Sequence, residues 1–591
     1  MSSQQTISER IVSETEYAKS VISVTQPRLW PLVVSLLTQF VLFALSITPS
    51  INNAMRFGFM LIGPAIGALL LVVWLLGLSR LPWKQRLAAA AMIAACVAVA
   101  AMTVHKSVGL SLFLYGVPLT TLAVLAAIVT TKARPQIRLR TLAACVVPVW
   151  AIFPFVRVDG YDGQYLPELS FRGSLTAEER MLAEQSVRST APEGIWQPVE
   201  EEWPEFRGSQ RDGRAAFDSG VQDWDASAPT EFWRHPIGPG WSSFIYVSGR
   251  LFTQEQRGDV EAVTCYDATT GVLIWLHSDE QRFSDVVSGS GSRATPTYAS
   301  GRIYAYGSKG ILNCLDAATG SVVWQRDLMT EVNAKLPVWG FASSPLVAND
   351  LVIVYADGDD NNGLVAYNSD TGEPAWRVTS GGMNFSSAQL VTIDNTPQII
   401  FGDSNGLRAF APSTGEEIWS FKPTEWRGPN VCQPQMVSST DFVVPTGDGT
   451  GVVRVSVTRD QSGVWQVSER WSNNRIKPSF NDFVFYGGHL YGFDQSILVC
   501  LDAETGERRW KGGRYGFGQM LLLESIGQII VISETGELVL INAAPERLDE
   551  RARIPAIEGK TWNHPIVVGD RLFIRNGEEM AAFELGSGND Q

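Results

Sequence analysis

YDATTGVLIW, residues 266–275, decides the fold of this chain, because close variants of it recur four more times. The variants are LDAATGSVVW (315–324), YNSDTGEPAW (367–376), FAPSTGEEIW (410–419) and LDAETGERRW (501–510). The common form is D-x-x-T-G-x-x-x-W, with Asn368 and Ala411 in place of the aspartate in the third and fourth copies. The Asp side chain bonds the backbone two residues on, and the glycine supplies the positive φ that ends a hairpin loop. We expect the tryptophan on the returning strand to dock between neighbouring sheets at five positions: Trp275, Trp324, Trp376, Trp419 and Trp510.

A second element recurs eight times after residue 240: an apolar strand, a polar or glycine turn and another apolar strand. The copies are SSFIYVSGRLF, ATPTYASGRIYAYG, SSPLVANDLVIVY, SSAQLVTIDNTPQIIFG, QPQMVSSTDFVVPTG, KPSFNDFVFYGGHLYGF, QMLLLESIGQIIVIS and NHPIVVGDRLFIRN. Repeats of about 45 residues built from short strands are typical of β-propellers. The last copy ends one strand short, at MAAFEL, and a ring of blades leaves no free edge. We therefore predict an eight-bladed β-propeller over residues 206–591, with TEFWRH around Glu231–His235 supplying the missing outer strand.

The N-terminal part is predicted to be an α-helical transmembrane bundle. Its five apolar runs, several of which approach the ~20 residues that cross a bilayer, cover residues 29–48, 57–79, 87–104, 108–130 and 139–156. Lys and Arg gather before the first run and in the second and fourth connections, whereas the opposite side carries only Arg56 and Lys106. This asymmetry predicts a cytoplasmic N-terminal segment (1–28), a membrane domain (29–156) and a propeller on the far side, in the periplasmic or extracytoplasmic space. Residues 157–205 read as a linker with one short helix starting at Thr176.

Composition excludes several classes of function. Of 591 residues, 18% are charged, and the net charge is −14, so an acidic exterior makes nucleic acid an unfavourable partner. The six cysteines show no disulfide framework, no haem-attachment CxxCH and no paired CxxC for zinc. Apart from Arg140 at the start of the last run, no Asp, Glu, Lys, Arg or His side chain lies inside the five apolar runs, so we interpret the bundle as an anchor for the lipid bilayer, with a quinone or lipid pocket between the helices as the alternative.

The repeats resemble the pyrroloquinoline-quinone (PQQ) repeat superfamily. Its quinoprotein dehydrogenases hold PQQ and a Ca²⁺ or Mg²⁺ ion in the central channel, whereas its BamB-type propellers are scaffolds without a cofactor. EEWPEFRGSQRDGR (201–214), PVWGFASSPLV (337–347) and KPSFNDFVFYGGHLYGF (477–493) look like the BamB-like propellers common in planctomycete-type bacteria. The membrane arrangement is similar to that of membrane-bound quinoprotein glucose dehydrogenase, which implies a protein of the bacterial cytoplasmic membrane.

The residues that lead each innermost strand are expected to line the central channel. They are Trp241, Arg293, Trp339, Asn384, Gln433, Lys477, Asn563 and His564, and Arg293 and Lys477 are the candidates for carboxylate contacts with a PQQ-like or sugar-like ligand. A metal candidate is DGDDNNG (357–363), where Asp357, Asp359 and Asn361 match the opening of a Ca²⁺ loop. Asn362 and Asn368 depart from that pattern, so the loop also reads as a solvated hairpin turn.

Three functional hypotheses follow. The first is a non-catalytic propeller that binds an envelope protein partner. The second is a PQQ- and Ca²⁺-dependent dehydrogenase of alcohols or sugars that passes electrons to membrane quinone; the absence of adjacent cysteines and the compact blades count against it. The third is a sensor that binds a small molecule in the channel, for which no cytoplasmic output domain follows. We favour the first, and no catalytic residue can be named.

Overall fold

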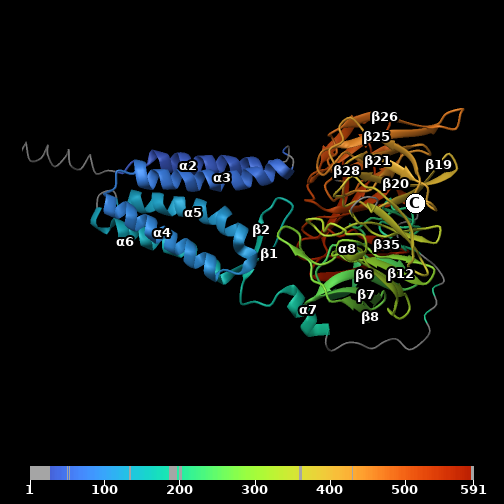
Figure 1. Cartoon of the computed structure of the whole chain (residues 1–591), viewed down its shortest axis with the longest axis horizontal. Coiled ribbons are helices and arrows are strands. Elements are labelled where there is room, and N and C mark those ends of the chain that lie inside the picture. The colour runs from blue at the N-terminus through green and yellow to red at the C-terminus, as the bar shows by residue number, and fades with distance from the viewer. Residues whose placement is uncertain are drawn as a thin grey trace, which may run out of the picture. The chain divides into compact units, whose positions relative to one another are not determined.

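The protein forms two compact units, Met1–Ser174 and Leu175–Gln591. The computed structural model describes residues 27–48, 51, 53–131, 135–185, 196, 198, 202–358, 362–428 and 430–586. The first unit is helical and the second is all-β apart from short helices (Figure 1).

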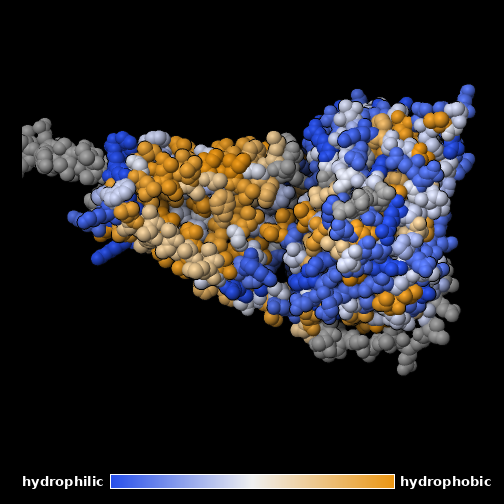
Figure 2. Space-filling view, viewed as in Figure 1, coloured by the Kyte–Doolittle hydropathy of each residue, from blue (hydrophilic) through white to orange (hydrophobic). Residues whose placement is uncertain are grey.

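The helical unit contains five apolar helices in its described residues: α2 (Trp30–Ser46), α3 (Asn53–Val73), α4 (Trp83–Thr103), α5 (Gly109–Thr130) and α6 (Arg138–Ala151). Four apolar helical stretches are long enough to cross a membrane, namely Met55–Leu78, Trp83–Thr103, Lys106–Thr130 and Arg138–Phe155. The first predicted span, 29–48, corresponds to α2, which is apolar but has only 17 residues. The surface of these helices is largely hydrophobic, in contrast to the mostly hydrophilic surface of the propeller (Figure 2).

Small residues allow the helices to approach closely. A Cβ at Gly67 of α3 would lie 2.3 Å from the buried Gln39 side chain of α2, and one at Gly116 of α5 would lie 2.6 Å from the Trp150 ring of α6. The Trp150 indole also donates to Thr120 Oγ1 over 2.9 Å. Close contact at small residues with an added polar bond is the usual way in which helices associate in lipid.

The second unit is an eight-bladed propeller. Within the described residues, eight sheets follow one another along the chain, each with four sequential antiparallel strands except where the ends of the chain intervene. The first strands of the blades lie around the hub, where several neighbouring ones contact each other. They are β5 (Ile245–Val247), β11 (Thr297–Ala299), β15 (Leu346–Ala348), β19 (Gln389–Ile393), β23 (Gln435–Met436), β27 (Val484–Tyr486), β31 (Gln519–Leu523) and β35 (Ile566–Val568).

The remaining strands build outward in the same order. The second strands are β6 (Arg250–Arg257), β12 (Arg302–Tyr306), β16 (Leu351–Tyr355), β20 (Thr396–Asp403), β24 (Asp441–Pro445), β28 (His489–Asp494), β32 (Gln528–Ile532) and β36 (Arg571–Arg575). The third strands are β7 (Val260–Asp267), β13 (Ile311–Asp316), β17 (Leu364–Asn368), β21 (Gly406–Phe410), β25 (Val452–Arg459), β29 (Ile497–Asp502), β33 (Glu537–Asn542) and β37 (Glu579–Glu584). The outer strands are β8 (Leu273–Asp279), β14 (Val322–Asp327), β18 (Pro374–Val378), β22 (Glu417–Phe421), β26 (Trp465–Asn473), β30 (Arg508–Gly512), β34 (Asp549–Pro555) and β4 (Thr230–Pro236).

The predicted closure is present, because β4 pairs antiparallel with β37 and completes the eighth blade. A second contribution from the beginning of the unit was not predicted. The short strand β3 (Arg214–Ala215) pairs in parallel with the inner edge of β31 and gives the seventh blade a fifth strand.

The turn motif joins neighbouring blades. Trp275 Nε1 donates to the carbonyl of Ala317, which follows the turn Asp316 of the next blade, over 3.2 Å. Its ring covers Gly320 of that turn, where a Cβ would lie 2.5 Å from the indole. Equivalent bonds run from Trp324 to Ser369, Trp376 to Pro412, Trp510 to Ala544 and Trp233 to Ala268. Trp419 differs, because the fifth blade lacks the turn motif, and its indole bonds Gln398 of its own blade instead.

The segment predicted as a linker contains more structure than one helix. Residues after the last apolar helix form the hairpin β1 (Val156–Tyr161) and β2 (Pro167–Phe171) in the helical unit. The helix that follows, α7 (Ala177–Gln185), belongs to the propeller unit and begins with a capping box, in which Thr176 and Glu179 bond each other's backbone N–H groups at 2.7 and 3.0 Å. Glu178 holds α7 to the propeller through Arg282 (2.8 Å).

Candidate functional site

The hub of the propeller is a ring of hydrogen bonds at the positions that lead the first strands. At most of these positions a side chain accepts from the backbone N–H of the equivalent residue in the preceding blade. The bonds run from Ser243 to Thr295 (3.0 Å), Thr295 to Ser344 (2.9 Å), Ser344 to Ser387 (2.8 Å), Gln433 to Asp482 (2.8 Å) and His564 to Ser243 (2.9 Å). The Gln433 amide oxygen is suited to accept from the Ser387 N–H (2.9 Å). Because the bond from His564 links the eighth blade to the first, the ring is closed at the hub as well as at its outer edge.

The central channel is crossed by residues 203–215, which we call the plug segment. Trp203 exchanges two backbone bonds with Tyr246 of the first blade (3.1 and 2.9 Å). The Pro204 carbonyl accepts from Tyr298 of the second blade (2.8 Å), and the Gly213 carbonyl accepts from Leu522 of the seventh (2.9 Å). The chain of the propeller itself therefore occupies the part of the channel in which the resemblance placed a ligand.

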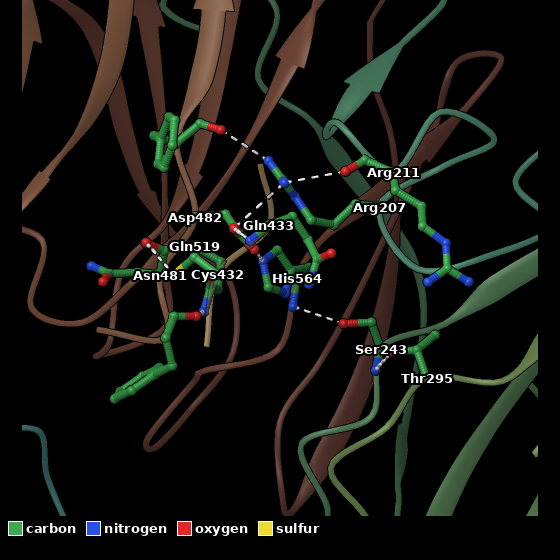
Figure 3. Close-up of polar contacts among 12 residues, drawn as sticks. Arg207, Arg211, Ser243, Thr295, Cys432, Gln433, Asn481, Asp482, Gln519 and His564 are labelled. Atoms are coloured by element: carbon green, nitrogen blue, oxygen red, sulfur yellow. Dashed lines mark hydrogen bonds and ion pairs between the residues drawn. The ribbon is translucent and has the colours of Figure 1, made fainter. Parts of the chain in front are cut away.

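Arg207 is the buried centre of the plug segment (Figure 3). Its guanidinium lies 3.5 Å from the Asp482 carboxylate, and their side chains are 1% and 3% exposed. It also donates to the Phe483 carbonyl (2.9 Å) and to the Asp212 carbonyl (3.1 Å) of the plug segment itself. A buried charge is tolerated only when it is paired and hydrogen-bonded, and Arg207 meets both conditions.

Arg211 extends in a different direction from Arg207 (Figure 3). Its guanidinium donates to the carbonyls of Ala388 (2.9 Å) and Pro345, which lead the first strands of the fourth and third blades. Glu205 neutralises it over 2.5 Å. The two arginines thus tie the plug segment to different blades around the channel, the third and fourth through Arg211 and the sixth through Arg207.

Burial and pairing set the charges at this centre. Burial acts to raise the pKa of Asp482, but the Arg207 guanidinium and a hydrogen bond from His564 outweigh it and hold this pKa below its usual value. Burial lowers the pKa of His564, so its imidazole is neutral at pH 7. Since Asp482 is ionised and can only accept, Nε2 of His564 carries the proton in their 3.1 Å bond.

The structure separates the residues expected to line the channel. Gln433 and His564 belong to the hub ring, and Asn563 joins it by donating to the Ser242 carbonyl (2.8 Å). Asn384, before the fourth blade, accepts from the N–H of Asn430, before the fifth, over 3.2 Å. These amides hold loops and blades together and already have protein partners.

The two cations chosen for carboxylate contacts are each paired with a nearby aspartate. Arg293 lies 2.6 Å from Asp285, and Lys477 lies 3.1 Å from Asp494. Asp494 is shared with Lys511 over 2.5 Å, so the pairing reduces the positive charge at Lys477 without removing it.

The tryptophans of the predicted set take part in aromatic contacts. The Trp241 ring lies 4.8 Å from Trp562 and the Trp339 ring lies 4.7 Å from Phe385. Lys560 stands over both Trp241 (5.4 Å) and Trp562 (4.7 Å). Trp241 also donates through its indole to the Ser288 carbonyl (2.8 Å).

The residues of the hub do not fit PQQ with a divalent cation. A Ca²⁺ ion needs several oxygen ligands, mostly carboxylates. Asp482, the carboxylate of the described hub ring, already serves Arg207, His564 and the Gln433 N–H. No group of three or more His, Cys, Asp or Glu side chains that could hold a metal occurs among the described residues. Of the predicted metal candidates, Asp359 and Asn361 lie outside those residues.

Sequence reasoning missed Arg207, Arg211 and Asp482. One signal was visible, since the strand copies begin with S-S, A-T, Q-P, N-D or N-H pairs at equivalent places, as expected for a repeated polar ring. The two arginines gave no such signal, because each occurs once and its partners in the blades lie 133 to 276 residues away in the chain.

Comparisons with known proteins agree with this architecture. The family model described as outer membrane protein assembly factor BamB matches residues 218–336 and 259–512. BamB of Yersinia pestis is 21% identical over 294 residues, which cover 48% of this chain and 70% of that protein. Quinohemoprotein alcohol dehydrogenase ADH-IIG of Pseudomonas putida is 28% identical over 139 residues, 22% of this chain and 18% of the enzyme. The crystal structure of BamB from Moraxella catarrhalis aligns with a TM-score of 0.43 and 14% identity, over 60% of this chain and 99% of that one.

The fold and the hub define a class of protein: an eight-bladed propeller with its own chain in the channel, preceded by apolar helices long enough to span a membrane. The propeller belongs to the PQQ-like repeat family that contains BamB-type propellers and quinoprotein dehydrogenases.

Proposed function

We propose that this chain is a membrane-anchored propeller that binds an envelope protein and holds it at the membrane surface. The observation that carries the proposal is the filled channel. Arg207 and Arg211 occupy the hub with protein bonds, so the outer faces and the channel mouth remain as the binding surfaces. The similarity to BamB, whose name describes assembly of outer membrane proteins, supports a scaffold in the bacterial envelope.

The proposed location is the cytoplasmic membrane of a bacterium, with the N-terminus in the cytoplasm and the propeller outside it. The loops with Arg80, Lys84 and Arg86, and with Arg138 and Arg140, would then face the cytoplasm. Reporter fusions test this: alkaline phosphatase, which is active only outside the cytoplasm, should be active at residue 586 and inactive in the loop at residue 81. The reverse pattern would contradict the proposed orientation.

The binding function is tested by cross-linking in living cells that produce the tagged full chain. We expect the same envelope protein to be recovered from the wild type and from the double variant Arg293→Ala, Lys477→Ala, which lacks the two cations that were expected to contact a carboxylate ligand. A scaffold does not need those cations, whereas a channel that recognises a carboxylate ligand does. Recovery of no specific partner, or its loss in this variant, would contradict the proposal.

The alternative, a PQQ-dependent dehydrogenase that passes electrons to membrane quinone, finds support in the similarity to ADH-IIG. That similarity covers only 18% of the enzyme. Asp482 is already bonded to the Gln433 N–H and paired with Arg207, which does not favour cofactor binding. We therefore rank the scaffold first.

A further inference from the structure

The plug segment leaves part of the channel mouth open. A cavity of about 720 Å³ lies between the plug segment and the first strands of the third, fourth and fifth blades. Its floor includes Gln210 and Arg211, and its wall includes β15, β19 and β23. This volume is within the range of sites that enclose a ligand.

The wall of the cavity is made of strand edges. In each of these three blades the first strand ends the sheet order, so its inward edge is paired with no further strand among the described residues. The strand β19 is the longest of the three, with five residues, against three in β15 and two in β23. An exposed edge of this kind presents backbone N–H and C=O groups to any chain that lies beside it.

Equivalent edges in other blades are already occupied by chain. The inner edge of β31 is paired by β3, and Tyr246 on the inner edge of β5 is paired by Trp203. Both occupants belong to the plug segment. The hub of this propeller therefore accepts extended chain on its inner edges, and the plug segment is not paired along β19.

Two buried glutamines that line the cavity each have an amide oxygen without a hydrogen-bond partner among the described residues. The Oε1 atoms of Gln389 and Gln435 accept no hydrogen bond in the described part of the protein, although these residues are only 2% and 1% exposed. Their amide nitrogens donate to the carbonyls of Gln210 (3.1 Å) and Met436 (3.4 Å), which leaves the two oxygens without a donor. A buried acceptor without a donor costs free energy, so a ligand that donates to these oxygens would recover it once the two amides turn toward the cavity.

We propose that the cavity receives an extended peptide segment of the partner protein, which adds to the free edge of β19 as a strand. The peptide supplies backbone N–H groups to the β19 edge and side-chain or backbone donors to Gln389 and Gln435. This site rests on the proposed scaffold function and gives it a place and a binding mode.

The charges of the cavity indicate the chemistry of the peptide. Glu205 is paired with Arg211, and Arg214 lies 3.2 Å from Asp212 and 2.8 Å from Glu524. Because these charges are neutralised within the protein, the site favours an uncharged segment. Leu390 of β19 is 40% exposed and provides an apolar contact on the same wall, so alternating apolar and hydroxyl or amide side chains suit the groove.

A display library of random peptides of about ten residues, the upper length of an ordinary strand, tests the proposal on the full-length chain in detergent. Peptides are selected on the wild type and measured again on Leu390→Lys, which places a charge on the exposed edge. The matched control is Val322→Lys on the outer strand β14, where the side chain is 48% exposed. We expect Leu390→Lys to weaken binding by about tenfold or more, and Val322→Lys to leave it within about twofold.

Backbone methylation shows whether the peptide binds as a strand. In a strand, alternate N–H groups point to the same side, so methylating one alternate set should weaken binding by about tenfold and methylating the other set should have little effect. Failure to enrich any peptide, equal binding to Leu390→Lys and wild type, or equal effects of both methylated sets would overturn the proposal. Cross-linking in cells distinguishes failure of this site from failure of the proposed scaffold function. Equal recovery of a partner with the wild type and with Leu390→Lys would reject this site and keep the scaffold function. Recovery of no specific partner would reject the scaffold function.

Discussion

Replacing Gly320 by alanine tests how the blades are held together. Gly320 closes the turn of the second blade with φ of +74°, and an added Cβ would lie 2.5, 2.7 and 3.1 Å from three carbons of the Trp275 ring in the first blade. The control is Gly301→Ala in the same blade, where φ is +79° and no atom lies within 4 Å of the new Cβ. Both variants carry the same backbone strain and the same change in the unfolded chain, so their difference reports the contact between blades.

The expected magnitudes follow from these distances. Alanine in the left-handed region costs about 1 kcal/mol in both variants. In Gly320→Ala the indole must also move, which costs about 1–3 kcal/mol as in other overpacked sites, and its 3.2 Å bond to the Ala317 carbonyl is weakened, at about 1 kcal/mol. We therefore expect Gly320→Ala to be less stable than Gly301→Ala by about 2–4 kcal/mol.

Urea unfolding of the full chain in detergent, followed by tryptophan fluorescence, measures this difference as a shift of the propeller transition. Limited proteolysis at increasing urea concentration provides a second probe that does not depend on the indole environment. Equal midpoints for the two alanine variants would refute the reasoning, because they would mean that the contact of Trp275 with the next turn does not hold the blades together.

Three further predictions concern the hub. Arg207→Met leaves the Asp482 carboxylate buried without its cation and should lower the stability by about 3–5 kcal/mol. Adding Asp482→Asn should restore part of this loss, whereas a double variant whose loss equals the sum of the two single losses would show that the residues do not act as a pair. Burial holds the pKa of His564 below its usual value, so near that usual value the unfolded chain binds a proton that the folded chain does not. Stability should therefore fall as the pH is lowered from 7 through about 6.5. In His564→Gln the urea midpoint should change less between pH 7 and 5 than in the wild type, and an equal change in both would contradict this assignment. Titration of the full chain with PQQ and Ca²⁺ should change neither the quinone absorbance nor the tryptophan fluorescence, since Asp482 is already engaged, and saturable binding would reopen the dehydrogenase alternative.

The propeller was predictable because its information is local and repeated. The turn Asp316-to-Gly320 and the tryptophan that follows it lie within nine residues, and the same arrangement recurs often enough to count blades. The closing strand β4 was also predictable, since the last repeat lacks one strand and a ring has no free edge. The hairpin of β1 and β2 was missed because its short strands carry no repeat and little alternation.

The candidate site was predictable only in its location. The positions that lead the first strands do form the hub, but their side chains serve as bonds between blades rather than as a lining open to a ligand. Gln433 and His564 illustrate this, because a polar residue at such a position has the same appearance in the sequence whether it faces a ligand or the next blade. Arg293 and Lys477 were chosen for their charge, and the aspartates that pair with them could be identified only in the folded protein.

The sequence by itself determined the apolar helices, the eight blades and the strand that closes them, because each depends on periodicity or on contacts between neighbours in the chain. Only the tertiary structure decided what fills the channel. The plug segment pairs with β31 of the seventh blade and β5 of the first blade, which are near it in space and far from it in sequence. Arg207 gains its partner Asp482 only when the ring has closed. The open edge of β19 is likewise a property of the closed ring, because the plug segment pairs with β5 and β31 and leaves the edges of β15, β19 and β23 unpaired among the described residues.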